Sequence, residues 1–170
     1  MLAKGYSFWL MPTGEVYNKF SSLIEKLAEK YSIPLFEPHI TLLGEIQQPE
    51  DEIIQKAQLL ITEQKPFPIT LRMIDYQDFY FRALFVKADI PKSLRVLHNR
   101  AKEIFEMQYI PDYMAHLSLL YGTFPQEVKE KIIEKIGKDQ TTELTINGID
   151  LFKTTGEVNT WYRIRKFPFL

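Results

Sequence analysis

The chain has 170 residues, of which 45% are hydrophobic, 14% aromatic and 25% charged, a composition that predicts one globular domain and excludes a disordered tail. Its 21 basic and 22 acidic residues give a formal net charge of −1. That balance lacks the basic surplus typical of proteins that bind long polyanions, but it leaves room for a small anion or a nucleic-acid end in a local pocket. The absence of cysteine excludes disulfides, thiolate nucleophiles and cysteine-based metal sites.

Strand and helix patterns alternate along the first half of the chain. The apolar run at residues 1–12 is too short for a signal peptide or a membrane span, so we expect a cytoplasmic protein with no membrane partner. The elements expected in this half are a buried strand at 5–11, a helix from Thr13 that ends before Pro34, a strand at 39–44, a helix from Pro49 and a strand at 67–74.

The second half repeats this order. The elements expected there are a strand at 80–88, a helix from Pro91 to about residue 107, a strand at 116–122, a helix from Pro125 to about residue 137, and strands at 141–154 and 159–167. The segment PHITLLG in the first half matches AHLSLLYG in the second, and each precedes a helix that begins with proline. We interpret this as an internal duplication and predict an α+β fold: one domain over residues 1–170, with two pseudo-symmetric β-α-β-α-β lobes at about 1–77 and 78–170.

Two matching motifs carry the chemistry, His39-Ile40-Thr41 and His116-Leu117-Ser118. Residues i and i+2 of a strand point to the same face, so each histidine shares a face with its hydroxyl while the leucine or isoleucine between them points into the core. If the lobes are related by a pseudo-twofold axis, two imidazoles and two hydroxyls meet across one cleft. The third histidine, His98, has no hydroxyl partner and is expected at a helix surface or boundary.

Such a site suits phosphodiester opening. Two imidazoles with ordinary pKa values near 6.5 can divide the roles of general base and general acid at neutral pH. The hydroxyls can donate to the non-bridging oxygens of a phosphoryl group, and these donors face the developing charge, so we expect no metal and no cofactor. A strained cyclic phosphate fits best, since its leaving oxygen stays tethered.

The segments HITL and HLSL resemble the paired motifs of the two-histidine phosphoesterase superfamily, and YSFWLMP, PDYMAHLSLLYG and LFKTTGEVNTWYRIRKF are similar to its cyclic phosphodiesterases. The resemblance covers nearly the whole chain and implies a two-lobed fold with antiparallel sheets lining a central cleft. By position it implies His116 as base, His39 as acid, and Thr41 and Ser118 as phosphate-holding hydroxyls. Ala115 departs from the pattern, because plant-type members tend to have proline before the second histidine.

The same resemblance places aromatic side chains around a nucleobase. Trp9 and Tyr113 correspond to base-flanking positions, where stacking contributes about 1–3 kcal/mol per base. A core position for Trp9 stays open, because its strand is apolar on both faces, whereas Tyr113 lies in a loop. Arg82, Arg163 and Arg165 are expected as solvated or sheet-edge charges.

The resulting hypothesis is a monomeric, metal-independent enzyme that hydrolyses 2′,3′-cyclic nucleotides or ADP-ribose 1″,2″-cyclic phosphate to a phosphomonoester. Its partner would be a small cyclic nucleotide or an RNA terminus. One alternative is an RNA-end 2′,3′-cyclic phosphodiesterase or ligase, which the near-neutral charge disfavours. Another is a catalytically idle nucleotide- or RNA-binding module, which the two intact motifs disfavour.

Overall fold

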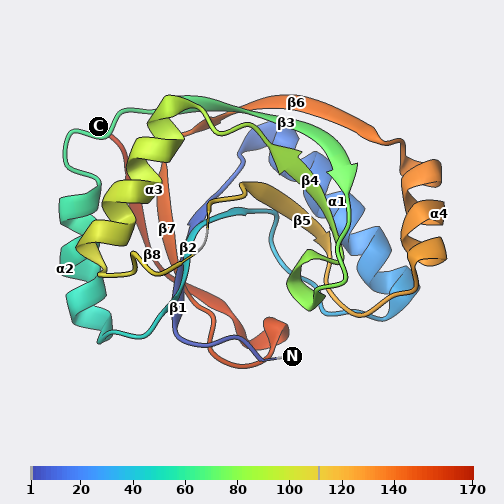
Figure 1. The fold of residues 1–170 in the computed structure, drawn as a ribbon, viewed down its shortest axis with the longest axis horizontal. Coiled ribbons are helices and arrows are strands. Elements are labelled where there is room, and N and C mark those ends of the chain that lie inside the picture. Colours follow the sequence, from blue (N-terminus) through green and yellow to red (C-terminus); the bar gives the residue numbers. More distant parts are fainter. Residues whose placement is uncertain (1, 111) are drawn as a thin grey trace.

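The computed structural model describes residues 2–110 and 112–170, and in this part of the chain eight strands form one antiparallel sheet that four α-helices cover (Figure 1). The sheet order is β6-β3-β4-β5-β2-β1-β7-β8. The strands are β1 (Tyr6–Leu10), β2 (Ile40–Ile46), β3 (Phe67–Asp75), β4 (Leu84–Ala88), β5 (His116–Leu120), β6 (Asp139–Ile146), β7 (Gly148–Lys153) and β8 (Tyr162–Pro168). The α-helices are α1 (Gly14–Tyr31), α2 (Glu50–Leu60), α3 (Lys92–Ile104) and α4 (Gln126–Ile136).

The element order confirms the predicted α+β class and shows the expected repeat, because β1-α1-β2-α2-β3 is followed by β4-α3-β5-α4-β6. The two halves of the sheet are nevertheless not the two halves of the chain. Strand β3 lies between β4 and β6, whereas β7 and β8 lie beside β1. Each half of the sheet therefore contains strands from both sides of residue 77, because β3 pairs with β4 and β6, and β7 pairs with β1.

The helices also pack against strands of the other half of the chain. Helix α1 joins β1 to β2 but contacts β5, and α3 joins β4 to β5 but contacts β2 and α2. Figure 1 accordingly shows α2 and α3 at one end of the molecule and α1 and α4 at the other. No helix in residues 2–110 and 112–170 is long and apolar enough to cross a membrane.

Three predicted strands differ from the structure. The run at 159–167 begins within a 3₁₀ helix, Val158–Thr160, and strand β8 starts only at Tyr162. The run at 80–88 begins as a short 3₁₀ helix, Tyr80–Arg82, because the chain turns there through a bond from Gln77 N to Arg82 O (3.0 Å); strand β4 starts only at Leu84. The run at 141–154 is two strands, because β6 pairs with β3 whereas β7 pairs with β1 and β8. The second strand starts at Gly148, where a Cβ atom would come within 2.5 Å of the Phe167 carbonyl oxygen.

The two central strands, β2 and β5, separate the core from the motif face. Ile40, Leu42, Leu117 and Leu119 are each at most 1% exposed and belong to the apolar core. The alternation that buries these four residues turns the histidine and hydroxyl positions toward the opposite face of the sheet.

Candidate active site

Strands β2 and β5 are neighbours in the sheet, and this places the two motifs side by side. Ile40 is paired with Leu117 in an antiparallel register. Antiparallel partners one residue further on are therefore His39 with Ser118 and Thr41 with His116, and opposed residues point to the same face. All four motif side chains line one cavity of about 310 Å³.

Both imidazoles are held in the same way. His39 Nδ1 donates a hydrogen bond to the carbonyl oxygen of Glu37 (2.6 Å), and His116 Nδ1 donates to that of Met114 (2.8 Å). A carbonyl only accepts, so the proton of each neutral ring sits on Nδ1 and the lone pair on Nε2. In the described residues neither Nε2 has a hydrogen-bond partner, which leaves one basic nitrogen of each ring for a substrate.

Burial makes both rings hard to protonate. The pKa of His39, which is 5% exposed, is lowered to about 3. Its burial is the main cause and the neighbouring His116 contributes, whereas the bond to Glu37 acts in the opposite direction. Burial also lowers the pKa of His116, and the cation of Arg82 adds to this effect. At neutral pH both imidazoles are therefore neutral.

The two hydroxyls differ in their surroundings. Ser118 is 5% exposed, and its Oγ donates to the carbonyl oxygen of Phe81 (3.0 Å). Thr41 is half-buried, and its Oγ1 makes no hydrogen bond within residues 2–110 and 112–170. Thr41 is thus ready to donate to an anion, whereas Ser118 must turn its proton away from Phe81 to do so.

Trp9 lines the cavity, but its ring faces are not available to a base. One face stacks on His39 (centroids 3.5 Å apart, planes at 6°) and the other on Phe152 (3.7 Å, 20°), and the residue is 2% exposed. Of the two positions that the sequence left open for Trp9, the structure shows the buried one, with both ring faces covered. The indole instead supports the His39 ring and fixes its plane.

Tyr113 lies in a loop, as expected, but it does not line the cavity. Its ring stacks on His98 (4.0 Å, 13°), and its hydroxyl donates to the carbonyl oxygen of Thr41 (2.9 Å). Burial raises the pKa of this phenol. His98 is also more buried than predicted, at 4% exposed, and its Nδ1 donates to the Leu42 carbonyl oxygen (2.8 Å). These two rings hold the backbone of β2 through its Thr41 and Leu42 carbonyl oxygens and do not face the cavity.

The remaining wall contains residues that the sequence patterns did not assign to the site. They are Ala3, Lys4, Ser7, Gly44, Glu45, Phe79, Phe81, Arg82, Tyr121, Thr154 and Trp161. Arg82 had a sequence signal, because it interrupts an otherwise apolar run that was interpreted as a strand. Glu45 had none, since it reaches the cavity from a backbone kink with φ of 58°.

Arg163 supports the site from outside the cavity. Its Nε lies 2.7 Å from the carboxylate of Asp150, and another nitrogen lies 3.3 Å from that of Glu37. Burial raises the pKa of Asp150, against the nearby cations. Arg163 therefore anchors the residue whose carbonyl orients His39. In residues 2–110 and 112–170 no three histidine, aspartate or glutamate side chains form a group that would hold a metal ion.

Known proteins resemble this chain in sequence and in fold. The family model for cyclic phosphodiesterase-like proteins matches residues 4–168. A cyclic phosphodiesterase from Arabidopsis thaliana is 27% identical over 130 residues, which are 76% of this chain and 72% of that protein. The structure of E. coli LigT complexed with 3′-AMP superimposes with a TM-score of 0.63 at 13% identity, covering 98% of both chains, and apo LigT gives 0.64 at 12% identity over 99% of both.

An antiparallel sheet with a His-x-[Thr/Ser] motif at the start of each of its two central strands has the same fold as the LigT structures. The match over residues 4–168 shows that the chain belongs to the cyclic phosphodiesterase-like family. Its activity is accordingly that of a cyclic phosphodiesterase.

Proposed function

We propose that this enzyme opens the 2′,3′-cyclic phosphate of a nucleotide, or the related ADP-ribose 1″,2″-cyclic phosphate, to a phosphomonoester. The observation that carries the proposal is the pair of imidazoles on one 310 Å³ cavity, each with Nδ1 bonded to a carbonyl and Nε2 left unpartnered. A cavity of that size accommodates a ribose with its cyclic phosphate, and a base extends to the rim.

The proposed step is an in-line hydrolysis. Water attacks phosphorus while one Nε2 takes its proton, and the bond from phosphorus to one ribose oxygen breaks as the other Nε2 gives its proton to that oxygen. One phosphorus–oxygen bond forms and one breaks, and the proton count of the imidazole pair is unchanged. Thr41 and Ser118 donate to the non-bridging oxygens, where negative charge accumulates.

The division of roles depends on the substrate anion. The resemblance implies His39 as acid and His116 as base, yet burial lowers the pKa of His39 to about 3. An acidic role therefore requires the bound phosphate to restore a proton to His39. An anion next to an imidazole raises its pKa, so substrate binding supplies this condition.

The base is proposed to lie against the aromatic rim rather than on Trp9 or Tyr113. Phe81 and Trp161 are 5.9 Å apart at the cavity, and Phe79 is 42% exposed beside them with the Arg82 guanidinium over its ring at 4.8 Å. A spacing of 5.9 Å leaves no room for a base between the two rings, so the base contacts their open edges. Arg82 and Lys4 supply positive charge for the phosphate.

A substrate panel tests the proposal. The four 2′,3′-cyclic mononucleotides, ADP-ribose 1″,2″-cyclic phosphate and a 2′,3′-cyclic-ended oligoribonucleotide would be incubated with the enzyme, and the products identified by phosphorus NMR. We expect conversion of a small cyclic phosphate to one monoester, unchanged by EDTA. Failure to open any small cyclic phosphate would refute the proposal, and preference for the oligomer would favour the RNA-end alternative.

A further inference from the structure

One wall of the cavity is a single loop that connects β3 to β4. This loop, residues 76–83, carries the cavity-lining residues Phe79, Phe81 and Arg82, and its Phe81 carbonyl oxygen accepts the bond from Ser118. Its internal bonds are few: Gln77 N donates to Arg82 O (3.0 Å), and Arg82 N donates to Phe79 O (2.9 Å). The position of the wall therefore depends on what holds the loop from outside.

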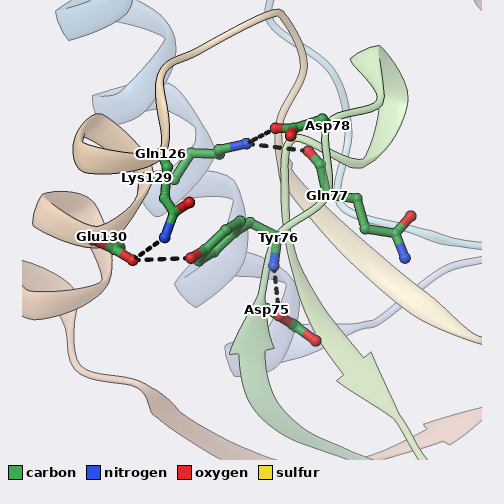
Figure 2. A network of polar contacts seen from close by, with 7 residues as sticks. All are labelled: Asp75, Tyr76, Gln77, Asp78, Gln126, Lys129 and Glu130. Carbon is green, nitrogen blue, oxygen red and sulfur yellow. Dashed lines mark hydrogen bonds and ion pairs between the residues drawn. The ribbon is translucent and has the colours of Figure 1, made fainter.

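Helix α4 holds it through one face. Gln126, Lys129 and Glu130 are three and four residues apart, so their side chains lie on the same side of the helix. Figure 2 shows this face turned toward the loop, with Lys129 extending to Gln77 and Asp78. Glu130 accepts bonds from the Tyr76 hydroxyl (2.9 Å) and from Gln126 Nε2 (2.7 Å).

Lys129 is the unusual member of this face, because its side chain is only 1% exposed. A buried ammonium costs free energy of desolvation unless it is paired and hydrogen-bonded. Its Nζ donates to the Asp78 carboxylate (2.6 Å) and the Gln77 carbonyl oxygen (3.3 Å), and it lies 5.0 Å from the Tyr76 ring centroid. All three partners belong to the loop. The contacts that offset the desolvation of the ammonium are therefore the same contacts that hold the loop in place.

We propose that Lys129 is a positioning residue of the active site: from outside the cavity it fixes the β3–β4 loop and thereby the substrate-facing positions of Phe79, Phe81 and Arg82. It touches none of the reacting atoms. The proposal rests on the proposed function for its kinetic consequence, because the loop side chains act by binding the nucleotide.

In this ion pair Lys129 is buried and Asp78 is exposed. A variant of Lys129 can therefore loosen the loop without unfolding the protein. The Asp78 side chain is 94% exposed, so removing the ammonium strands no buried charge. A Lys129→Met variant fills a similar volume and keeps an apolar helix face. We expect it to stay folded with the loop loosened, whereas His39 and His116 keep their own carbonyl bonds.

The experiment compares Lys129→Met with Lys131→Met, which removes an exposed lysine from the same helix. For the best cyclic nucleotide of the panel, we expect Lys129→Met to raise KM about three- to tenfold with kcat within about twofold, and Lys131→Met to match the wild type. Hydrogen exchange in residues 76–83 should quicken about tenfold in Lys129→Met alone. Asp78→Asn, a surface change, should shift KM and exchange in the same direction.

Unchanged exchange in Lys129→Met and Asp78→Asn would overturn the proposal, and so would faster exchange with an unchanged KM. A fall of kcat at constant KM would also overturn it, since that result would show damage to the catalytic pair rather than to the loop. If the wild type opens no cyclic phosphate, the proposed function fails, and the exchange comparison still decides whether Lys129 holds the loop.

Discussion

At the scale of single residues, the two motif histidines lie in different environments. His39 is stacked on Trp9, whereas His116 meets Phe85 edge-on, with centroids 5.1 Å apart and planes at 65°. The closer enclosure of His39 is the reason that burial lowers its pKa to about 3. A histidine that is neutral when folded and protonated when unfolded makes stability depend on pH.

The sign of this effect follows from the lowered pKa. Stability from His39 is fully present above the unfolded pKa of about 6.5 and is lost as pH falls from there toward 3, because only the unfolded chain takes up the proton. At about 1.4 kcal/mol per pKa unit, the loss reaches the order of 4 kcal/mol near pH 3. His39→Asn keeps a donor for the Glu37 carbonyl but does not titrate, so its unfolding free energy should fall less steeply between pH 7 and 4.

Urea unfolding at a series of pH values measures that slope. Ser118→Ala is the matched control, because it alters the same cavity without changing a titrating group, and it should keep the slope of the wild type. A His39→Asn variant with the same slope as the wild type would show that His39 is not the source of the pH dependence.

The sequence predicted that the histidine and hydroxyl of each motif lie on one face. It did not predict that both ring faces of Trp9 are covered. The positions i and i+2 of a strand share a face whatever the fold, so the grouping of His39 with Thr41 and of His116 with Ser118 followed from spacing alone. The covered faces of Trp9 depend on His39 and Phe152, which lie 30 and 143 residues away in the chain. No local pattern reports such contacts.

At the scale of elements, strand β2 contains an irregularity that faces the cavity. The register to β1 shifts between the pair Tyr6–Ile46 and the pair Phe8–Leu43, and Glu45 within this bulge has φ of 58°. Residues other than glycine pay about 1–2 kcal/mol for the left-handed conformation. The bulge thus places Glu45 at the cavity wall at a cost in stability.

Glu45→Gly should therefore raise the free energy of unfolding by about 1 kcal/mol, as measured by urea denaturation. Glu45→Ala is the control, since it removes the same carboxylate without relieving the backbone, and it should give no such gain. An equal gain in both variants would attribute the effect to charge instead of to the bulge.

The elements that sequence periodicity predicted best were the helices. Their apolar spacing is local, and the predicted starts at Thr13, Pro49, Pro91 and Pro125 each lie one residue before the observed helix. The misjudged strands were those whose limits are set by partners. The run at 141–154 is uniformly extended in sequence, and its division after Ile146 reflects pairing with two different parts of the sheet.

At the scale of the whole molecule, the duplication brings the motif strands together by exchange. Helix α1 connects β1 to β2 but packs against β5 in the other half of the sheet. Helix α3 connects β4 to β5 but packs against β2, so each helix lies over the half to which its own strands do not belong. Sequence repeats revealed the two copies but not this packing, since the repeat order is identical whether or not the helices exchange. In the resulting sheet β2 and β5 are neighbours.

This arrangement supports the central claim that two imidazoles on one cavity share the proton transfers. The direct measurement is kcat/KM against pH for the best cyclic nucleotide, with wild type, His39→Ala, His116→Ala and His98→Asn, the last being a histidine outside the cavity. Burial lowers the pKa of both motif histidines, so the wild type should show a bell with its optimum below pH 6.5. Each motif variant should lose about 10²–10⁴ in rate and one limb of the bell, whereas His98→Asn keeps both. A motif variant that retains wild-type turnover, or a wild-type optimum well above pH 7, would contradict the account.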